Sequence, residues 1–258
     1  MRPNGLRKVW DEGRVALNAW LALGSPYGAE ILAKLSYDSV TVDLQHGMFD
    51  FETALAMFQA ISTGAVVPMA RIAANEPWMA QKVLDAGAYG VICPMISTAE
   101  ECRRFVAACR YPPLGERSFG PARGLLFGGS DYPQCANDHV LTWGMIETTQ
   151  GLENIEDILA VRGLDGIYIG PSDLALNLGV PLMREVHEEV RAAITRLLEA
   201  THRAGRRAGI FCPTAAFGRE MIVLGFDLIT VSNDAEMLRG AAASLLETTR
   251  QTPGVVNA

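Results

Sequence analysis

Short apolar runs of strand length alternate along this chain with longer segments that carry apolar residues at helical spacing. Eight runs read as strands, at residues 16–23, 39–43, 66–72, 89–93, 141–146, 166–169, 207–212 and 228–231. Each leads into a helix-like segment, such as 51–61 after the second run. Eight alternations in 258 residues predict an α/β fold, a single (β/α)₈ TIM barrel. The alternative, a doubly wound open sheet, is disfavoured because no G-x-G-x-x-G follows the first strand.

Five further segments complete the expected organisation of one domain over residues 1–258. Residues 1–15 form an N-terminal arm. Residues 110–138 are rich in proline and glycine and predict a long irregular loop, and because such loops in compact domains are usually functional or mobile, we expect a lid or an interface. A single helix is expected over 152–161, and the last helix over 235–249. Residues 251–258 form a loose tail.

The bulk composition limits the classes of partner. The net charge is −7 and the sequence pI is about 5.2, whereas nucleic acids and anionic membranes attract basic surfaces. We therefore expect no nucleic acid and no membrane partner, and a small-molecule substrate. The five cysteines form no C-x-x-C pair, and the chain has neither a signal-peptide core nor an apolar run of membrane length, so a cytoplasmic location is expected.

Two carboxylates follow neighbouring strands of a predicted strand–helix–strand unit. Glu147 ends the run 141–146, and Asp173 follows the run 166–169. Parallel strands of such a unit end at the same edge of the sheet, so both acids should face one cleft. Mg²⁺ is usually held by one or two carboxylates, with water and substrate completing its shell. Acids are also common at helix starts, where they interact with the helix dipole, so spacing alone leaves both interpretations open.

A histidine and an arginine lie at two other strand ends. His46 follows the second strand, and Asp43 three residues earlier could accept one of its N–H groups and leave the other nitrogen free as a general base. The alternative is an ordinary loop histidine. Arg71 ends the third strand, where its guanidinium suits a carboxylate or a developing enolate oxygen. A structural ion pair across the barrel mouth would explain Arg71 equally well.

Two kinds of site are disfavoured. The chain has three lysines, Lys8, Lys34 and Lys82, and none lies at a predicted strand end, whereas a Schiff-base aldolase needs a lysine amine in its site. The turns after the seventh and eighth strands lack the glycine-rich opening that commonly holds phosphate in barrels, so a phosphorylated substrate is not expected.

Several segments together resemble one known family. WLALGSPYGAEILAKLSYDSVTVDLQHG, VVPMARI, LDAGAYGVICPMISTAEE, RSFGPARG, MIETTQGLENIEDILAVRGLDGIYIGPSDLALNLG and GIFCP occur in this order and resemble the HpcH/HpaI aldolase family of divalent-metal-dependent pyruvate aldolases. The resemblance spans about residues 17–231. It implies a modified phosphoenolpyruvate/pyruvate-type barrel that assembles as a homo-oligomer, a trimer or hexamer, often with the last helix exchanged between subunits.

The resemblance also implies roles for individual residues. Glu147 and Asp173 would bind Mg²⁺, Mn²⁺ or Co²⁺, His46 oriented by Asp43 would be the acid/base, and Arg71 would stabilise an enolate. Ser172, with the backbone of Gly170 and Pro171, would line the site of the 2-oxo acid carboxylate, and Asp85 would approach a neighbouring subunit's active site. Trp20, Gln45, Met145 and Phe211 would contribute to substrate binding. Gln45 departs from the Glu found in many members and Met145 from the Gln found in some, which leaves the aldehyde partner open.

The expected activity is reversible cleavage of a 4-hydroxy-2-oxo acid to an aldehyde and pyruvate, or a related 2-oxo acid such as hydroxypyruvate, through a metal-stabilised enolate. One alternative is a citrate-lyase-like lyase acting on a coenzyme A thioester, for which Arg117 and Arg123 are the nearest candidates to bind nucleotide phosphate. The other is a non-catalytic barrel that binds 2-oxo acids, which would need no base such as His46.

Overall fold

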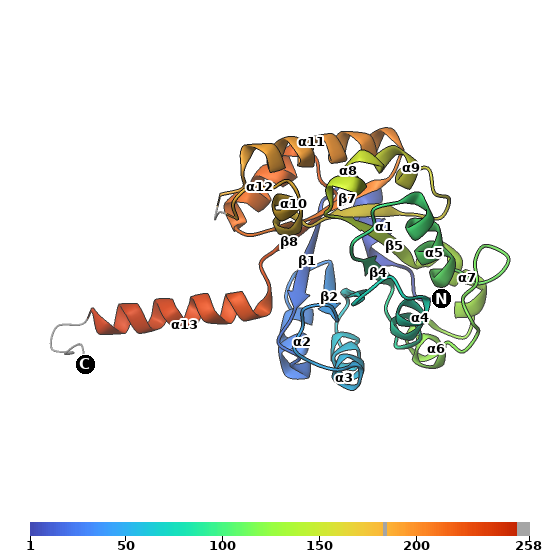
Figure 1. Cartoon of the computed structure of the whole chain (residues 1–258). Helices are drawn as coiled ribbons and strands as arrows, with labels where there is room; N and C mark the ends of the chain where they lie inside the picture. The colour runs from blue at the N-terminus through green and yellow to red at the C-terminus, as the bar shows by residue number, and fades with distance from the viewer. Residues whose placement is uncertain (183–184, 252–258) are drawn as a thin grey trace.

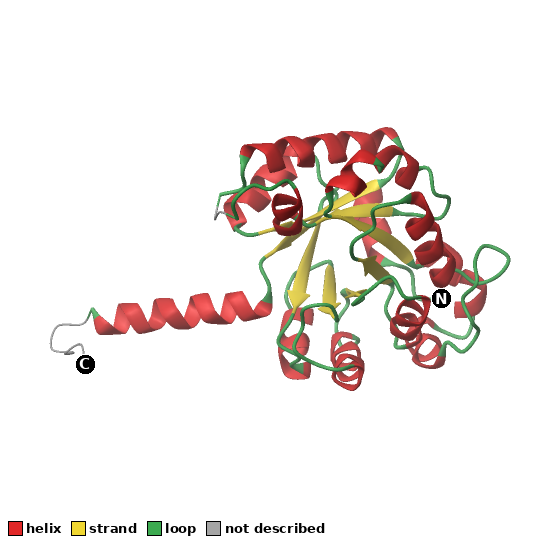
Figure 2. Ribbon diagram, viewed as in Figure 1, coloured by secondary structure: helices red, strands yellow, loops and turns green. Residues whose placement is uncertain are grey.

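Eight parallel strands close into a barrel in sequence order. The computed structural model describes residues 1–182 and 185–251. The strands are β1 (Ala16–Leu21), β2 (Ser39–Asp43), β3 (Val67–Arg71), β4 (Gly90–Cys93), β5 (Leu141–Ile146), β6 (Gly166–Ile169), β7 (Arg207–Cys212) and β8 (Leu228–Val231). Each strand pairs with the next, and β8 pairs with β1 (Figure 2). The predicted (β/α)₈ barrel is confirmed.

Helices form the outer layer of the barrel (Figure 1). They are α2 (Pro26–Ala33), α3 (Phe51–Ile61), α4 (Pro77–Asp85), α5 (Ala99–Cys109), α6 (Ala122–Gly128), α7 (Tyr132–His139), α8 (Thr149–Glu153), α9 (Ile155–Leu159), α10 (Pro171–Asn177), α11 (Glu188–Arg203) and α12 (Ala215–Leu224). Several begin at side-chain caps, as in α5, where Thr98 and Glu101 form a reciprocal capping box. These caps fix where each connection from a strand end turns into its helix.

The barrel interior contains a buried polar layer beneath the strand ends. Asn18 donates from Nδ2 to Thr230 Oγ1 at 2.9 Å, and its Oδ1 accepts from the hydroxyls of Ser39 and Thr41 at 2.8 and 3.0 Å. Tyr168 donates to Thr230 Oγ1 at 2.6 Å. Buried polar groups that find hydrogen-bond partners hold a single arrangement, so this layer supports the residues above it at the C-terminal end.

The N-terminal arm is a helix, α1 (Gly5–Asp11), that covers the opposite end of the barrel. Leu6, Val9 and Trp10 are buried, and Trp10 donates from its indole N–H to the carbonyl of Asp227 at 2.9 Å, immediately before β8. The helix had no periodic signal of its own because it is short. Tertiary packing of its apolar residues, rather than local propensity, stabilises it.

The segment 110–138 is not the long irregular loop that its composition predicted, because it contains α6 and most of α7. Its glycines serve close packing: a Cβ on Gly128 would lie 2.5 Å from the ring of Tyr132. The single helix expected over 152–161 is also wrong, since Asn154 ends α8 and begins α9.

The last helix, α13 (Asp234–Arg250), leaves the barrel instead of covering it (Figure 1). All of its residues are described, and none is buried. Leu238, Leu245 and Leu246 remain exposed along it. Apart from Gln251, the tail expected at 251–258 lies outside the described residues. Over residues 1–182 and 185–251, each helix falls short of the length or the hydrophobicity that a membrane crossing requires.

Candidate active site

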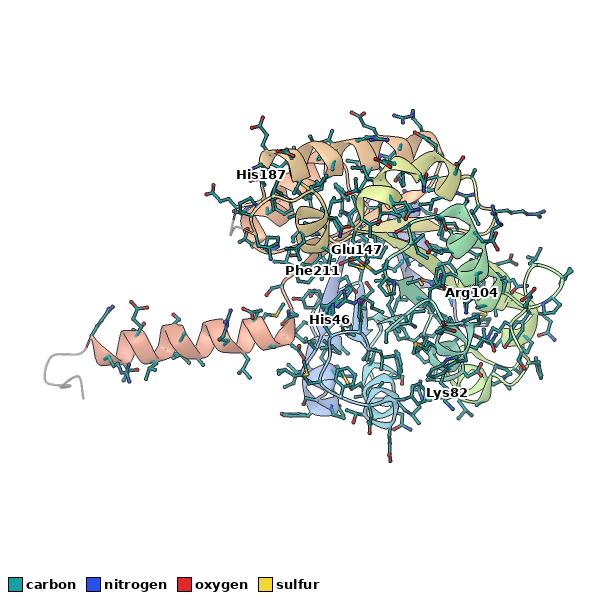
Figure 3. The ribbon with its side chains drawn as sticks, in the orientation of Figure 1. His46, Lys82, Arg104, Glu147, His187 and Phe211 are labelled. Carbon is teal, nitrogen blue, oxygen red and sulfur yellow. The ribbon has the colours of Figure 1, made fainter. Side chains whose placement is uncertain are left out.

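A cavity of about 310 Å³ opens at the C-terminal ends of the strands. It brings together residues from β1, β2, β3, β5, β6, β7 and the segment after β8: Trp20, Ala22, Asp43, His46, Arg71, Met145, Tyr168, Ser172, Asp173, Phe211, Asn233, Ala235 and Glu236. Eight of these were predicted as site residues. Figure 3 shows His46, Phe211 and Glu147 approaching one another at this end of the barrel, whereas Lys82 lies in the outer layer of helices.

Glu147, directly after β5, is buried beside this cavity, with 1% of its surface exposed. Its Oε1 accepts the backbone N–H of Met95 at 2.8 Å. Met95 follows β4 with a φ of 57°, a left-handed conformation that strains a non-glycine residue and is typical of functional sites. A Cβ on Gly170 would lie 2.5 Å from Glu147 Oε2, so only glycine permits this close approach. The protein thus fixes one oxygen of Glu147 and leaves the other without a donor among the described residues.

Asp173 lies in the first turn of α10, where Pro171 begins the helix. Its carboxylate lines the cavity and accepts no hydrogen bond from the residues that the structure describes. Burial raises the pKa of Glu147 to about 7; the Met95 N–H opposes this shift, the charge of Asp173 adds to it, and Arg71 opposes it. The two acids are therefore close enough to repel each other.

This carboxylate pair fits a divalent cation. A hard cation takes oxygen ligands, and its positive charge would offset both the burial and the repulsion from Asp173 that raise the pKa of Glu147. Within 1–182 and 185–251, no group of three or more His, Cys, Asp or Glu side chains is arranged to hold a metal ion. Two carboxylates with open positions are the arrangement usual for Mg²⁺, which keeps water and substrate in its shell.

Arg71 and Asp43 form a buried ion pair between adjacent residues of β3 and β2. The guanidinium donates from Nε and Nη2 to the two carboxylate oxygens of Asp43, at 2.9 and 2.5 Å. Trp20 donates its indole N–H to the same carboxylate at 3.0 Å, and its ring centroid lies 4.9 Å from the guanidinium carbon of Arg71. Burial by itself raises the pKa of Asp43, but the hydrogen bond and charge of Arg71 outweigh it and hold the pKa below its ordinary value.

The expected hydrogen bond from the His46 imidazole to Asp43 is wrong: Asp43 binds the backbone of the loop instead. Asp43 Oδ1 accepts the backbone N–H groups of Gln45 and His46, at 3.0 and 3.2 Å. With Arg71 and Trp20 also donating, the carboxylate has no capacity left for the imidazole. Asp43 therefore fixes the loop and the guanidinium, and among the described residues the exposed imidazole of His46 forms no hydrogen bond. Its access to the cavity suits proton transfer with a ligand.

The remaining predicted residues divide into two groups. Ser172, Met145, Phe211 and Trp20 line the cavity, and Trp20 packs edge-to-face on Phe211 with ring centroids 5.9 Å apart. Gly170 and Pro171 begin α10 beside Asp173. Gln45 contributes no atom to the cavity lining.

Asp85 ends α4 outside the cavity lining and pairs with Arg117 at 2.8 Å. Burial raises the pKa of Asp85, and the Arg117 guanidinium opposes that shift. The side chain of Arg117 is fully buried and also donates to the hydroxyl of Tyr132. Arg123 is bound to the carbonyls of Ala86 and Phe58. Both arginines considered for a nucleotide phosphate therefore already bind protein groups.

Three contributors to the site were missed from sequence. Met95 acts through its backbone, and Tyr168 packs on Trp20 with ring centroids 5.5 Å apart. Glu236 reaches the cavity from the first turn of α13. Alternation along β6 would have placed Tyr168 inside the barrel. Met95 carried no sequence signal because any residue can supply a backbone donor. Glu236 carried none because acids are common at helix starts.

Comparison with known proteins shows which family has this sequence and fold. Residues 17–239 match the family model HpcH/HpaI aldolase/citrate lyase. A hydroxypyruvate/pyruvate aldolase of Rhizorhabdus wittichii is 44% identical, over 96% of this chain and 99% of that protein. A 5-keto-4-deoxy-D-glucarate aldolase of Shigella dysenteriae is 32% identical, over 95% and 96%. The crystal structure of a family protein from Burkholderia cenocepacia superposes with a TM-score of 0.89 at 33% identity, covering 96% of this chain and 100% of that one. The chain therefore belongs to the HpcH/HpaI aldolase/citrate lyase family.

Proposed function

We propose that this protein is a divalent-metal-dependent aldolase that reversibly cleaves a 4-hydroxy-2-oxo acid to an aldehyde and pyruvate, or a related 2-oxo acid such as hydroxypyruvate. The observation that carries the proposal is the convergence of two under-coordinated carboxylates, an arginine and an accessible histidine around one cavity. The aldolases that share 44% and 32% of this sequence support the same reaction class.

Glu147 and Asp173 would hold the divalent cation, Mg²⁺, Mn²⁺ or Co²⁺. When bound, the cation would act as a Lewis acid toward the oxygens of the 2-oxo acid. Ser172 and the N-terminal turn of α10, beginning at Gly170 and Pro171, would receive the substrate carboxylate, because free backbone N–H groups at a helix start favour an anion.

The protein's own residues account for the proton and charge transfers. In cleavage, His46 would accept the proton of the C4 hydroxyl as the C3–C4 bond breaks and its electron pair becomes the enolate. Arg71, held by Asp43, would donate a hydrogen bond to the enolate oxygen, which carries charge only during the reaction. Proton return from His46 to C3 would then give the methyl group of pyruvate.

Neither alternative accounts for the site as well. A coenzyme A thioester lyase would need cations for the nucleotide phosphates, and Arg117 and Arg123 are committed to protein partners. A barrel that only binds 2-oxo acids would need no exposed imidazole in the cavity beside Arg71.

We further propose a homo-oligomer, a trimer or hexamer. The unburied helix α13, with its exposed leucines, supports exchange of this helix with a second copy. Asp85 lies outside the cavity of its own subunit, so a catalytic role for it would be in a neighbour's site. Arg117 pairs with Asp85, so segment 110–138 would lie at the same subunit interface. A reducing cytoplasm suits the five free cysteine thiols.

Exchange of the pyruvate methyl protons in D₂O tests the proposal without an aldehyde. Metal-stripped enzyme should leave the methyl signal in proton NMR unchanged. Added Mg²⁺ or Mn²⁺ should make it disappear, with the spectrum recorded after the paramagnetic Mn²⁺ is removed. His46→Ala should abolish the exchange, while His202→Ala, an exposed histidine on α11, should retain it. Exchange that persists in Glu147→Ala with a chelator present would refute the proposal.

A further inference from the structure

The end of the cavity away from Glu147 is built by the segment after β8 and the first turn of α13. Asn233, Ala235 and Glu236 line it beside Trp20 and Ala22, which lie at the end of the adjacent strand β1. Asp234 anchors this turn by accepting the backbone N–H groups of Ala22 and Leu23, at 2.7 and 3.3 Å. The turn therefore has a fixed position, although residues 238–250 of α13 are exposed.

The charges around the cavity are strongly unbalanced. Asp43, Asp173 and Glu236 line it and Glu147 lies beside it, whereas the guanidinium of Arg71 is the one Lys or Arg group in the described lining. Two donor groups of Arg71, Nε and Nη2, already bind Asp43. A divalent cation would cancel two of these negative charges, and a bound 2-oxo acid would add one back. The occupied cavity thus keeps an excess of negative charge.

Glu236 brings this negative charge to the distal end. Its backbone N–H donates to Asn233 Oδ1 at 2.9 Å, which leaves the Asn233 amide N–H₂ without a partner among described residues. The carboxylate pairs with Arg239 one turn along α13, but Arg239 is exposed and contributes nothing to the lining. The polar groups available to a second substrate here are therefore an amide donor and a carboxylate acceptor.

We propose that Glu236 and Asn233 form the subsite for the aldehyde partner, and that they select neutral, hydroxylated aldehydes over aldehydes that carry a carboxylate. A hydroxyl can donate to Glu236 and accept from Asn233, whereas a carboxylate has no hydrogen to donate to Glu236 and is repelled by its negative charge. This inference rests on the proposed aldolase function and adds to it the class of the second substrate.

Paired aldehydes test the inference in the aldol direction with pyruvate. kcat/KM is measured for glycolaldehyde against glyoxylate, and for butanal against succinic semialdehyde. Intrinsic aldehyde reactivity is the same for every variant, so the change in each ratio between variants isolates the effect of the cavity. Glu236→Gln combined with Arg239→Gln should lower the neutral-to-anionic ratio by about fivefold, the effect of one like-charge contact screened as in water. Glu236→Lys should lower it further.

Glu247→Gln, on the same helix and exposed, is the matched control and should leave both ratios unchanged. Asn233→Ala should reduce the advantage of glycolaldehyde over butanal. An unchanged ratio in the double variant, while wild-type enzyme exchanges the pyruvate methyl protons, would overturn the aldehyde subsite and leave the aldolase function standing. Absence of that exchange in wild-type enzyme would overturn both.

Discussion

Replacing Asp43 with Asn would test whether this carboxylate acts through Arg71. Asp43 is 2% exposed and accepts from the Arg71 side chain, the Trp20 indole and two backbone N–H groups. Asn keeps the shape but offers one acceptor oxygen and no charge. The guanidinium of Arg71, 7% exposed, would then lose its counter-ion while remaining buried.

Breaking a buried ion pair by removing one partner costs about 3–5 kcal/mol. For a chain of this size that corresponds to a fall in Tm of roughly 10 °C. Because the folded-state pKa of Asp43 is depressed, its stabilisation is present above its unfolded pKa and is lost as pH falls through the folded value. The difference between wild type and Asp43→Asn should therefore shrink in acid, below about pH 4.

Urea unfolding and pyruvate proton exchange separate stability from catalysis. Asp165→Asn is the matched control, since Asp165 pairs with Arg110 and Arg7 at the other end of the barrel. It should lose stability but keep exchange, whereas Asp43→Asn should lose both. Removing both charges in Asp43→Asn/Arg71→Met should restore part of the stability and none of the exchange. An Asp43→Asn protein with wild-type stability and exchange would refute the role assigned to the pair.

Four further outcomes are expected. Because burial raises the pKa of Glu147 to about 7, a proton competes with the cation below that pH, and metal affinity measured by calorimetry should fall by about tenfold per pH unit there. The same raised pKa penalises the charged form, so the metal-free protein should gain about 3 kcal/mol from this group as pH falls from above 7 toward 4.5, and Glu147→Gln should abolish that gain in urea titrations. Trp10→Ala should lower the free energy of unfolding by about 3–5 kcal/mol without changing metal affinity, since Trp10 is buried against the far end of the barrel; a loss below 1 kcal/mol would contradict its packing role. Leu245→Asp, on the exposed face of α13, should reduce the mass measured by light scattering, whereas Glu247→Gln should not; an unchanged oligomer with Leu245→Asp would argue against helix exchange.

Composition misled the sequence analysis wherever tertiary packing decided the local structure. The glycines and prolines of 110–138 indicated a loop, yet Gly128 is needed because Tyr132 packs directly against its backbone. Helix α1 had too few residues to be recognised, and burial of Trp10 and Leu6 stabilises it. In both cases the stabilising contact comes from outside the segment.

The sequence by itself determined the barrel and the strand ends that carry the site. Apolar periodicity depends on which side of each element is buried, and it therefore predicted the strands near Asp43, Arg71, Glu147 and Asp173. The tertiary structure alone decided how those groups pair. Asp43 binds Arg71 rather than the His46 imidazole, and the backbone of Met95 holds Glu147. A carboxylate accepts hydrogen bonds from the donors that lie near it in space. Spacing along the sequence does not show which donors these are.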